Sequence, residues 1–309
     1  MEKELTLVDP YEHDLHCYVW ETDVEVKGII QIIHGAGEHM KRYEHFAKAC
    51  NEAGFHVIGS DLLGHGLSAT KDDRVFFSDS IGFHIVYEGI RTVRDYIEEQ
   101  YPTLDVILFA HSMGSFFGRY AMIHNHHQYT QAIFSGTGVF SSFKTRVGIV
   151  LAKLIALVRG NEYVSDFFNH RILDGHIRHM RRNGLIHRKI DWLTQDRDMI
   201  KAFKDDPLTG KPFTIKAQQD VLSIIPEIQN KSLIKAGASS AALLFISGEY
   251  DALSDYGNGI KTLCRIYQDS GYSNVHYKVL NNCRHEIINE IERDKHIETI
   301  LSFIQSNLK

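Results

Sequence analysis

The sequence predicts an α/β fold: a mostly parallel central sheet with helices on both faces and a helical cap inserted between two strands. Short apolar runs, such as residues 29–33 and 105–110, alternate with amphipathic segments such as residues 81–101. Continuous apolar runs are typical of strands covered on both faces, and strands that alternate with helices imply parallel pairing. The alternation stops between Gly138 and about Phe213, and we expect the cap there.

The predicted elements follow one another in a regular order. Residues 5–8 and 15–20 are predicted to form a hairpin, because turn-forming residues separate them at positions 9–12. Gly54 and Pro102 end two of the predicted helices. The further strands are expected at residues 29–33, 55–60, 105–110, 132–135, 243–246 and 275–280, and the helices at residues 43–53, 81–101, 112–125 and 289–308.

The length of the chain, 309 residues, fits one large domain with an insertion. We expect residues 1–138 and 214–309 to form the α/β core and residues 139–213 to form the cap. Within the cap, residues 147–158 are almost wholly apolar apart from Lys153. Two interpretations stay open for this stretch: a helix packed on the core, or a surface that contacts a lipid or an acyl chain.

Composition and charge restrict the class of function. Apolar residues make up 43% and charged residues 24% of the chain, which is ordinary for a globular protein. The net charge is −5 with no basic stripe, so nucleic acid is not expected as a partner. The N-terminus lacks the features of a secretory signal, and the four cysteines are scattered without a CxxC motif. We therefore expect a cytoplasmic protein with reduced thiols, and the sequence indicates no oligomeric state.

The strongest functional signal is the pentapeptide Ala110-His111-Ser112-Met113-Gly114. It lies where a buried strand turns into a helix, which is the context of a nucleophile elbow: a sharp turn presents the serine hydroxyl at the end of the sheet. The alternative is that Ser112 merely caps the helix. The strand–turn–helix context favours Ser112 as a nucleophile.

A glycine-rich segment, residues 34–39 (HGAGEH), directly follows the first central strand. Acyl transfer needs two N–H donors for the oxyanion of the tetrahedral intermediate. Elbow geometry makes the N–H of Met113 one donor, and we expect the N–H of Ala36 to be the other. An ordinary turn with two glycines, or a phosphate-binding loop, is the alternative.

A carboxylate and an imidazole follow two later strands. Asp251 comes just after strand 243–246, and His285 lies between the last strand and the last helix. A serine hydroxyl needs a base to take its proton and an acid to orient that base, and the order Ser, Asp, His is the one expected for this elbow. Asp255 and Glu249 remain rival acids, and the chain has 19 histidines in all.

Further motifs accompany these residues: Arg42-Tyr43, residues 61–68 (DLLGHGLS), residues 192–194 (WLT) with residues 206–208 (DPL), and Glu286 with Asn289-Glu290. From about residue 28 to residue 290, the chain resembles the monoacylglycerol lipase and lysophospholipase-like α/β hydrolases, also called serine aminopeptidase hydrolases. The resemblance departs at Ala110, where the family usually has glycine.

The resemblance implies the α/β-hydrolase fold and a carboxylic-ester hydrolase that works without a metal or other cofactor. It implies Ser112, Asp251 and His285 as the catalytic triad, with Ala36 and Met113 as oxyanion donors. The favoured partners are small-molecule esters of the monoacylglycerol, lysophospholipid or short acyl type, cleaved through an acyl-enzyme. Transient contact of the cap with a membrane surface follows from the second interpretation of residues 147–158.

Two other functions stay open. A small-peptide serine aminopeptidase would need an acidic cap residue near the site to bind a free amine. The candidates for that residue are Glu162, Asp166 and Asp174. A non-catalytic binding protein on the same fold is the third interpretation, and the complete set of triad residues argues against it.

Overall fold

A computed structural model describes residues 2–71, 73–125, 128–171 and 174–308. Within them, eight strands form one sheet in the order β1-β2-β4-β3-β5-β6-β7-β8. β1 and β2 pair with each other antiparallel, β2 also pairs antiparallel with β4, and all the other pairs are parallel. The strands are β1 (Glu2–Val8), β2 (Asp14–Trp20), β3 (Gly28–Ile33), β4 (Phe55–Ser60), β5 (Val106–His111), β6 (Gln131–Ser135), β7 (Ala242–Gly248) and β8 (Val275–Leu280). The predicted α/β fold with a mostly parallel sheet is confirmed.

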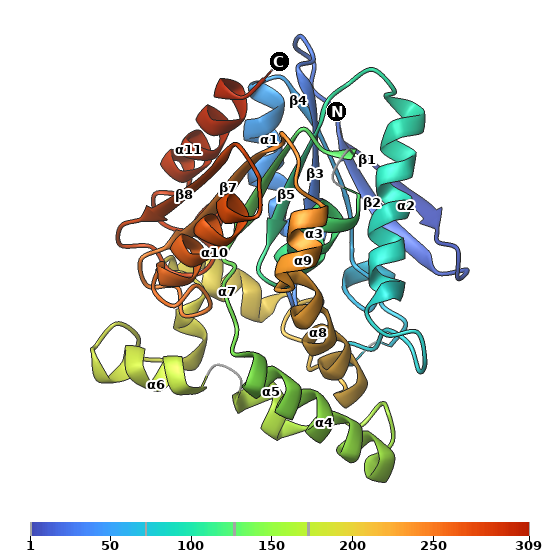
Figure 1. The fold of residues 1–309 in the computed structure, drawn as a ribbon, viewed down its shortest axis with the longest axis vertical. Helices are drawn as coiled ribbons and strands as arrows, with labels where there is room; N and C mark the ends of the chain where they lie inside the picture. The colour runs from blue at the N-terminus through green and yellow to red at the C-terminus, as the bar shows by residue number, and fades with distance from the viewer. Residues whose placement is uncertain (1, 72, 126–127, 172–173, 309) are drawn as a thin grey trace.

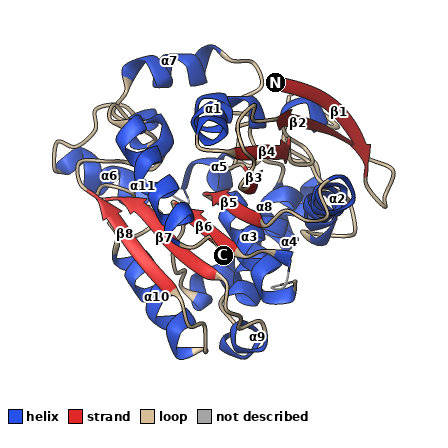
Figure 2. Ribbon diagram, turned by 90° about the horizontal axis from the view of Figure 1, so that it is seen from above, coloured by secondary structure: helices blue, strands red, loops and turns tan. Residues whose placement is uncertain are grey.

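Hydrophobic clusters cover both faces of the sheet. In β3 the side chains alternate: Ile29 and Ile33 belong to one cluster, and Ile30 and Ile32 to the other. The first cluster includes side chains of α2 (His84–Gln100), α3 (Met113–His124), α8 (Ile215–Ile228), α9 (Lys231–Ala236) and α10 (Asn258–Asp269). The second includes α1 (Glu44–Glu52) and α11 (Arg293–Ser306). Figure 2 shows these two layers of helices on opposite sides of the strands.

Two helices begin later than the sequence indicated. α2 begins at His84 rather than at position 81, because Gly82 adopts a left-handed φ of 76°, which interrupts the helical hydrogen bonds. α11 begins at Arg293, after a 3₁₀ turn at Ile287–Asn289. The apolar periodicity continues through both turns, so periodicity alone places these boundaries too early.

The segment between β6 and β7 contains a group of helices, of which α4 (Ser142–Arg159), α5 (Asp166–Arg171) and α6 (Asp174–Arg182) lie at the lower end of Figure 1. It also contains a 3₁₀ turn (Lys189–Trp192) and α7 (Arg197–Asp205). α4 packs along α8, which also packs against α3 of the core. The division into a core (residues 1–138 and 214–309) and a cap (residues 139–213) remains our proposal.

None of the helices in the described part of the chain is long and apolar enough to cross a membrane. The same residues contain no group of three His, Cys, Asp or Glu side chains arranged to hold a metal ion. All four cysteines are buried, and none forms a disulfide.

Candidate active site

Ser112 lies at the sharp turn between β5 and α3. Its backbone is in an unusual conformation, with φ 52° and ψ −123°, which a non-glycine residue adopts only where the surrounding structure enforces it. Ser112 is the N-cap residue of α3, but its side chain makes no capping hydrogen bond. Its Oγ lies 2.8 Å from Nε2 of His285 instead. The hydroxyl is therefore directed at a base and not used as a helix cap.

Two glycines of α3 make the turn possible. A Cβ at position 114 would lie 2.4 Å from the carbonyl oxygens of both Ile33 and His34, so Gly114 allows the end of β3 to pack against the elbow. A Cβ at position 118 would lie 2.8 Å from the Ala110 methyl group. Gly118 therefore gives room for the alanine that replaces the usual glycine of the motif, a compensation that the sequence reasoning missed.

Asp251 and His285 complete a hydrogen-bonded line with Ser112. His285 Nδ1 lies 2.9 Å from Asp251 Oδ1, which also accepts a hydrogen bond from the backbone N–H of Leu253 at 2.9 Å. Both side chains are almost fully buried. Asp251 lies in the loop after β7 and His285 in the loop after β8. The ends of these two neighbouring strands therefore place the two side chains close together.

The rival acids lie elsewhere. Asp255 is exposed, and Glu249 accepts a hydrogen bond from the backbone N–H of Asn282 at 3.0 Å. Asp251 is thus the carboxylate that the structure places on the imidazole.

The charges around His285 favour the protonated form of its imidazole. Burial by itself would lower the pKa of His285, but the nearby carboxylates together outweigh it: Asp251 contributes most, and Glu286 and Glu38 contribute less. The pKa of His285 therefore lies above its ordinary value. His111 packs beside it with ring centroids 4.7 Å apart, and burial lowers the pKa of His111 to about 4, so this neighbour is neutral.

The glycine-rich loop after β3 packs against the serine. A Cβ at position 35 would lie 3.0 Å from Cβ of Ser112, and Ala36 and Met113 both line the cavity beside the hydroxyl. Met113 is the first residue of α3, where the N–H has no partner within the helix. The positions of Ala36 and Met113 are compatible with oxyanion binding, and the assignment of their N–H groups to that role stays a prediction.

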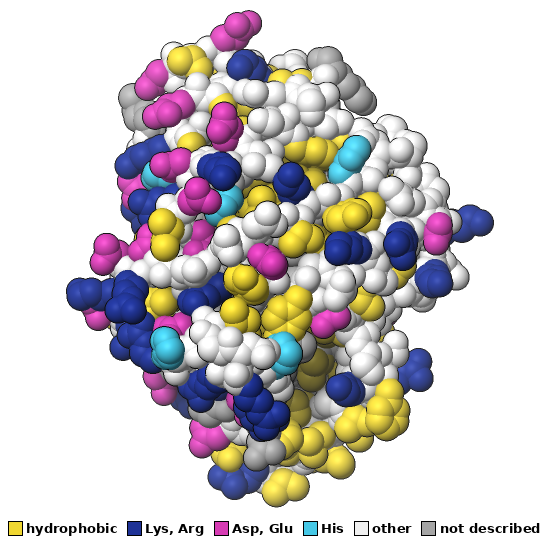
Figure 3. Space-filling view, turned by 90° about the vertical axis from the view of Figure 1, so that its left-hand side faces the viewer, with side chains coloured by type: hydrophobic (Ala, Val, Ile, Leu, Met, Phe, Trp, Pro, Cys, Tyr) yellow, Lys and Arg dark blue, Asp and Glu magenta, His cyan; other side chains and the backbone are white. Residues whose placement is uncertain are grey.

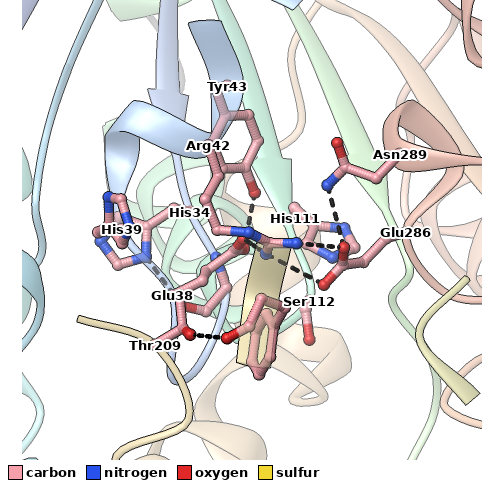
Figure 4. A network of polar contacts seen from close by, with 12 residues as sticks. His34, Glu38, His39, Arg42, Tyr43, His111, Ser112, Thr209, Glu286 and Asn289 are labelled. Atoms are coloured by element: carbon pink, nitrogen blue, oxygen red, sulfur yellow. Dashed lines mark hydrogen bonds and ion pairs between the residues drawn. The ribbon is translucent and has the colours of Figure 1, made fainter. Parts of the chain in front are cut away.

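A buried ionic network holds this loop to the loop that carries His285 (Figure 4). Arg42 forms a two-pronged pair with Glu286, at 2.6 and 3.1 Å, and a further ion pair with Glu38. Glu38 accepts hydrogen bonds from the N–H of Gly35 (2.6 Å) and the hydroxyl of Tyr43 (2.8 Å). One network therefore holds both the glycine-rich loop after β3 and Glu286, the residue next to His285.

Glu38, Arg42 and Glu286 all belong to the sequence motifs, but the motifs by themselves indicate no role for them. The i, i+4 spacing of Glu38 and Arg42 is a local signal that they pair. The contact with Glu286 joins positions 244 residues apart, and no local pattern shows it.

A cavity of about 380 Å³ opens beside Ser112. Its wall is mostly apolar and comes from both the core and the cap. The large apolar side chains that line it include Met113, Phe116, Phe168, Ile177, Trp192, Leu193, Phe203, Phe213, Val221 and Leu253. Such a cavity suits a small molecule with an apolar part, held with its reacting group at the hydroxyl.

Comparison with known proteins identifies the family. The family model Hydrolase_4, described as serine aminopeptidase, S33, matches residues 24–292. The chain belongs to this family. The resemblance seen in the sequence motifs is thereby confirmed.

The chain is also similar to individual proteins and to a solved structure. The chain is 26% identical to a monoacylglycerol lipase of Mycolicibacterium smegmatis over 296 residues, covering 94% of this chain and 92% of that protein. It is 36% identical to human monoglyceride lipase over 100 residues, which is 32% of this chain and 31% of that protein. The structure is similar to a carboxyl esterase of Bacillus coagulans in complex with glycerol, with a TM-score of 0.89, 26% identity and coverage of 100% and 99%.

Proposed function

We propose that this protein is a serine hydrolase that cleaves carboxylic esters through an acyl-enzyme. The observation that carries the proposal is the line from Ser112 through His285 to Asp251, with the serine hydroxyl at the wall of an apolar cavity. The relatives named monoacylglycerol lipase and the similar carboxyl esterase support an ester as the substrate. We infer monoacylglycerol-like, lysophospholipid-like or short acyl esters.

The geometry suits a two-step reaction. His285 takes the proton from Ser112 as Oγ attacks the ester carbonyl, and the N–H groups of Ala36 and Met113 stabilise the oxyanion. The imidazolium, held by Asp251, then gives its proton to the leaving alcohol. Water attacks the acyl-enzyme in the second step, with His285 again as the base, and the acid is released.

Cap carboxylates argue against the aminopeptidase alternative. Glu162 forms an ion pair with Lys71 at 3.2 Å, and Asp174 lies 3.7 Å from Lys189. Neither these two nor Asp166 is among the described residues that line the cavity. Within the described part of the cap, a free amine would therefore find no carboxylate at the cavity wall, and the apolar wall favours an acyl group.

Assays of a nitrophenyl ester beside an aminoacyl anilide test this choice. We expect the ester to be hydrolysed and the anilide to be turned over at a much lower kcat/KM. Preferred turnover of the anilide would reverse the assignment, and labelling by a fluorophosphonate probe shows in the same sample that the serine is reactive.

The pKa of His285 predicts the pH dependence of the reaction. The base must be neutral to accept the proton of Ser112, and its pKa is raised above the ordinary value of about 6.5. Protonation therefore removes activity as the pH falls through a pKa that lies above about 6.5. We expect the acid limb of a plot of kcat/KM against pH there, measured with a soluble ester. A limb well below pH 6 would contradict this environment of the base.

We also propose that the cap contacts membrane surfaces through α4. The helix exposes Phe143 (77%), Leu157 (83%) and Val158 (81%), with Val150 and Leu154 also exposed. Hydrophobic side chains gather at the lower end of the molecule in Figure 3, where Figure 1 places α4. Exposed apolar patches of this kind mark interaction surfaces. α4 packs on α8, which fits the first interpretation of residues 147–158. It also leaves an apolar face uncovered, which fits the second.

Replacing Leu157 and Val158 with glutamate tests the contact. Each side chain would contribute about 1.5–3 kcal/mol if fully buried in lipid, so we expect vesicle binding to fall at least about tenfold. Turnover of a soluble ester should not change. Val24→Glu, at an exposed apolar position in a loop of the core, is the matched control. Equal vesicle binding by both variants would exclude α4 as the contact surface.

The state of the cysteines supports a cytoplasmic location, which we propose. All four thiols are buried and unpaired. Unpaired cysteines are typical of proteins kept in a reducing compartment.

A further inference from the structure

The imidazole of His285 has an aromatic neighbour that comes from the cap segment. The indole of Trp192 stacks on it, with ring centroids 4.5 Å apart and an interplanar angle of 29°. Two backbone hydrogen bonds accompany the stack: the N–H of His285 donates to the carbonyl of Trp192 (3.4 Å), and the N–H of Glu286 donates to that of Leu193 (2.8 Å). The loop of the base and the segment of Trp192 are thus paired along their backbones.

Arg284, the residue before the base, fastens the same segment. Its guanidinium donates to three backbone carbonyls, those of Leu185 (2.5 Å), Asp191 (2.6 Å) and Thr194 (2.9 Å). Two of these carbonyls flank Trp192. The position of the indole is therefore set by a side chain of the loop that carries His285, and a shift of either segment moves the other.

We propose that Trp192 is a positioning residue for the base: the cap segment places its indole on His285, so that the seating of the cap segment and the alignment of the imidazole are coupled. The inference rests on the proposed hydrolase function. Trp192 also lines the cavity, so a substrate that fills the cavity touches the residue that holds the base.

The stack acts on both the orientation and the charge of the imidazole. The indole covers the ring and restricts its rotation, which keeps Nε2 directed at Ser112. The electron-rich face of an indole attracts a cation within about 6 Å, so it favours the imidazolium that forms when the serine gives up its proton. Gly136 leaves room at the edge of the ring, because a Cβ there would lie 2.8 Å from Cε1 of His285.

Other ionisable groups also face the imidazole and set the background for this effect: Asp251, Glu286, Glu38 and His111. The first three are carboxylates that favour the imidazolium, and His111 is neutral. A substitution at position 192 removes none of these side chains, so a change in the pKa of the base follows from loss of the indole or from the realignment of the imidazole that this loss allows.

The test compares Trp192→Leu with Trp192→Phe in the full chain, using a soluble nitrophenyl ester. Leucine keeps an apolar cover but removes the aromatic face. We expect kcat to fall about tenfold with KM changed less than about twofold, because a misaligned base slows the chemical step. The acid limb of kcat/KM should move down by about half a pH unit. Trp192→Phe should keep kcat within about threefold of the unmodified protein and should show little of the shift in the acid limb.

Phe168→Leu is the matched control, because Phe168 lines the same cavity from the cap segment and is not stacked on His285. It should change KM and leave the acid limb in place. An unchanged limb in Trp192→Leu, or an equal shift in Phe168→Leu, would overturn the inference. Counting the serines labelled by a fluorophosphonate corrects kcat for unfolded protein. If the unmodified protein neither labels nor hydrolyses the ester, the proposed function itself fails, which is a different result.

Arg284→Lys tests the link between the two segments. A lysine keeps the charge but lacks the planar fork of donors that reaches three carbonyls. We expect Arg284→Lys to show smaller changes in the same direction as Trp192→Leu: a lower kcat and an acid limb of kcat/KM at lower pH. The fold loss of kcat in the double variant should be smaller than the product of the two single losses, since both substitutions act through the same stack. Fully multiplicative losses would show that Arg284 does not act through Trp192.

Discussion

Replacement of Ser112 by alanine should reduce kcat for ester hydrolysis by about 10⁴-fold or more. The reaction proposed here has no other nucleophile, and removing one member of a triad leaves only the contribution of the oxyanion hole and of binding. The substitution removes one oxygen at a position where φ is 52°, and alanine has the same backbone preference as serine there. We therefore expect a folded protein that has lost its chemistry.

The measurement is kcat/KM with a nitrophenyl ester, together with the intact mass after treatment with a fluorophosphonate. Unmodified protein should gain one label, and the Ser112→Ala variant should gain none. Ser223→Ala is a matched control, because that hydroxyl donates to a backbone carbonyl of its own helix at 2.7 Å. Retention of ester turnover in Ser112→Ala would refute the mechanism.

Replacement of Asp251 by asparagine should also cost about 10⁴-fold in kcat, at nearly constant geometry. The carboxylate accepts from His285 Nδ1, which leaves Nε2 free to accept the proton of Ser112. An amide can donate to Nδ1 instead, and the imidazole would then carry its proton on Nε2, where it cannot act as a base. A smaller loss of kcat in Asp251→Asn at high pH would mean that another base replaces His285 there.

Asp255→Asn is the control for this experiment. Asp255 is exposed and has a left-handed backbone with φ 51°, a conformation that asparagine tolerates. We expect normal turnover. A large loss in Asp255→Asn with little loss in Asp251→Asn would exchange the roles that we assign to these two carboxylates.

The order of the elements and the position of each candidate residue follow from local patterns. Buried strands such as β5 are continuous apolar runs, and a parallel sheet brings their carboxyl ends to one edge. Ser112 and Asp251 each follow such a strand, and His285 follows β8, an edge strand in which His276, Tyr277 and Lys278 are exposed. Because these strands run parallel, the three residues could be predicted to meet at one edge of the sheet. The structure brings the three together with contacts of 2.8 and 2.9 Å, while their catalytic roles stay predictions.

Local patterns are less informative where a turn interrupts an apolar periodicity. The start of α2 is shifted to His84 because Gly82 adopts a left-handed conformation, and a glycine in a sequence does not reveal its own φ. Similarly, residues 147–158 are apolar whether a helix is buried or exposed. Only the position of α4 against α8 shows that one face remains uncovered.

Local patterns of the sequence thus predicted the α/β fold, the family, the strand–turn–helix at Ser112 and the residues that follow the strand ends, because period, turn chemistry and chain order are local properties. Only tertiary structure shows which distant side chains pack around Ser112 and His285. Arg42 meets Glu286 across 244 residues, and the indole of Trp192 reaches His285 from another segment. Partners of a buried charge or an aromatic ring are chosen by packing between distant segments, and that packing leaves no periodic trace along the chain. Sequence patterns are enough to single out Ser112, but they do not show the side chains that pack around His285.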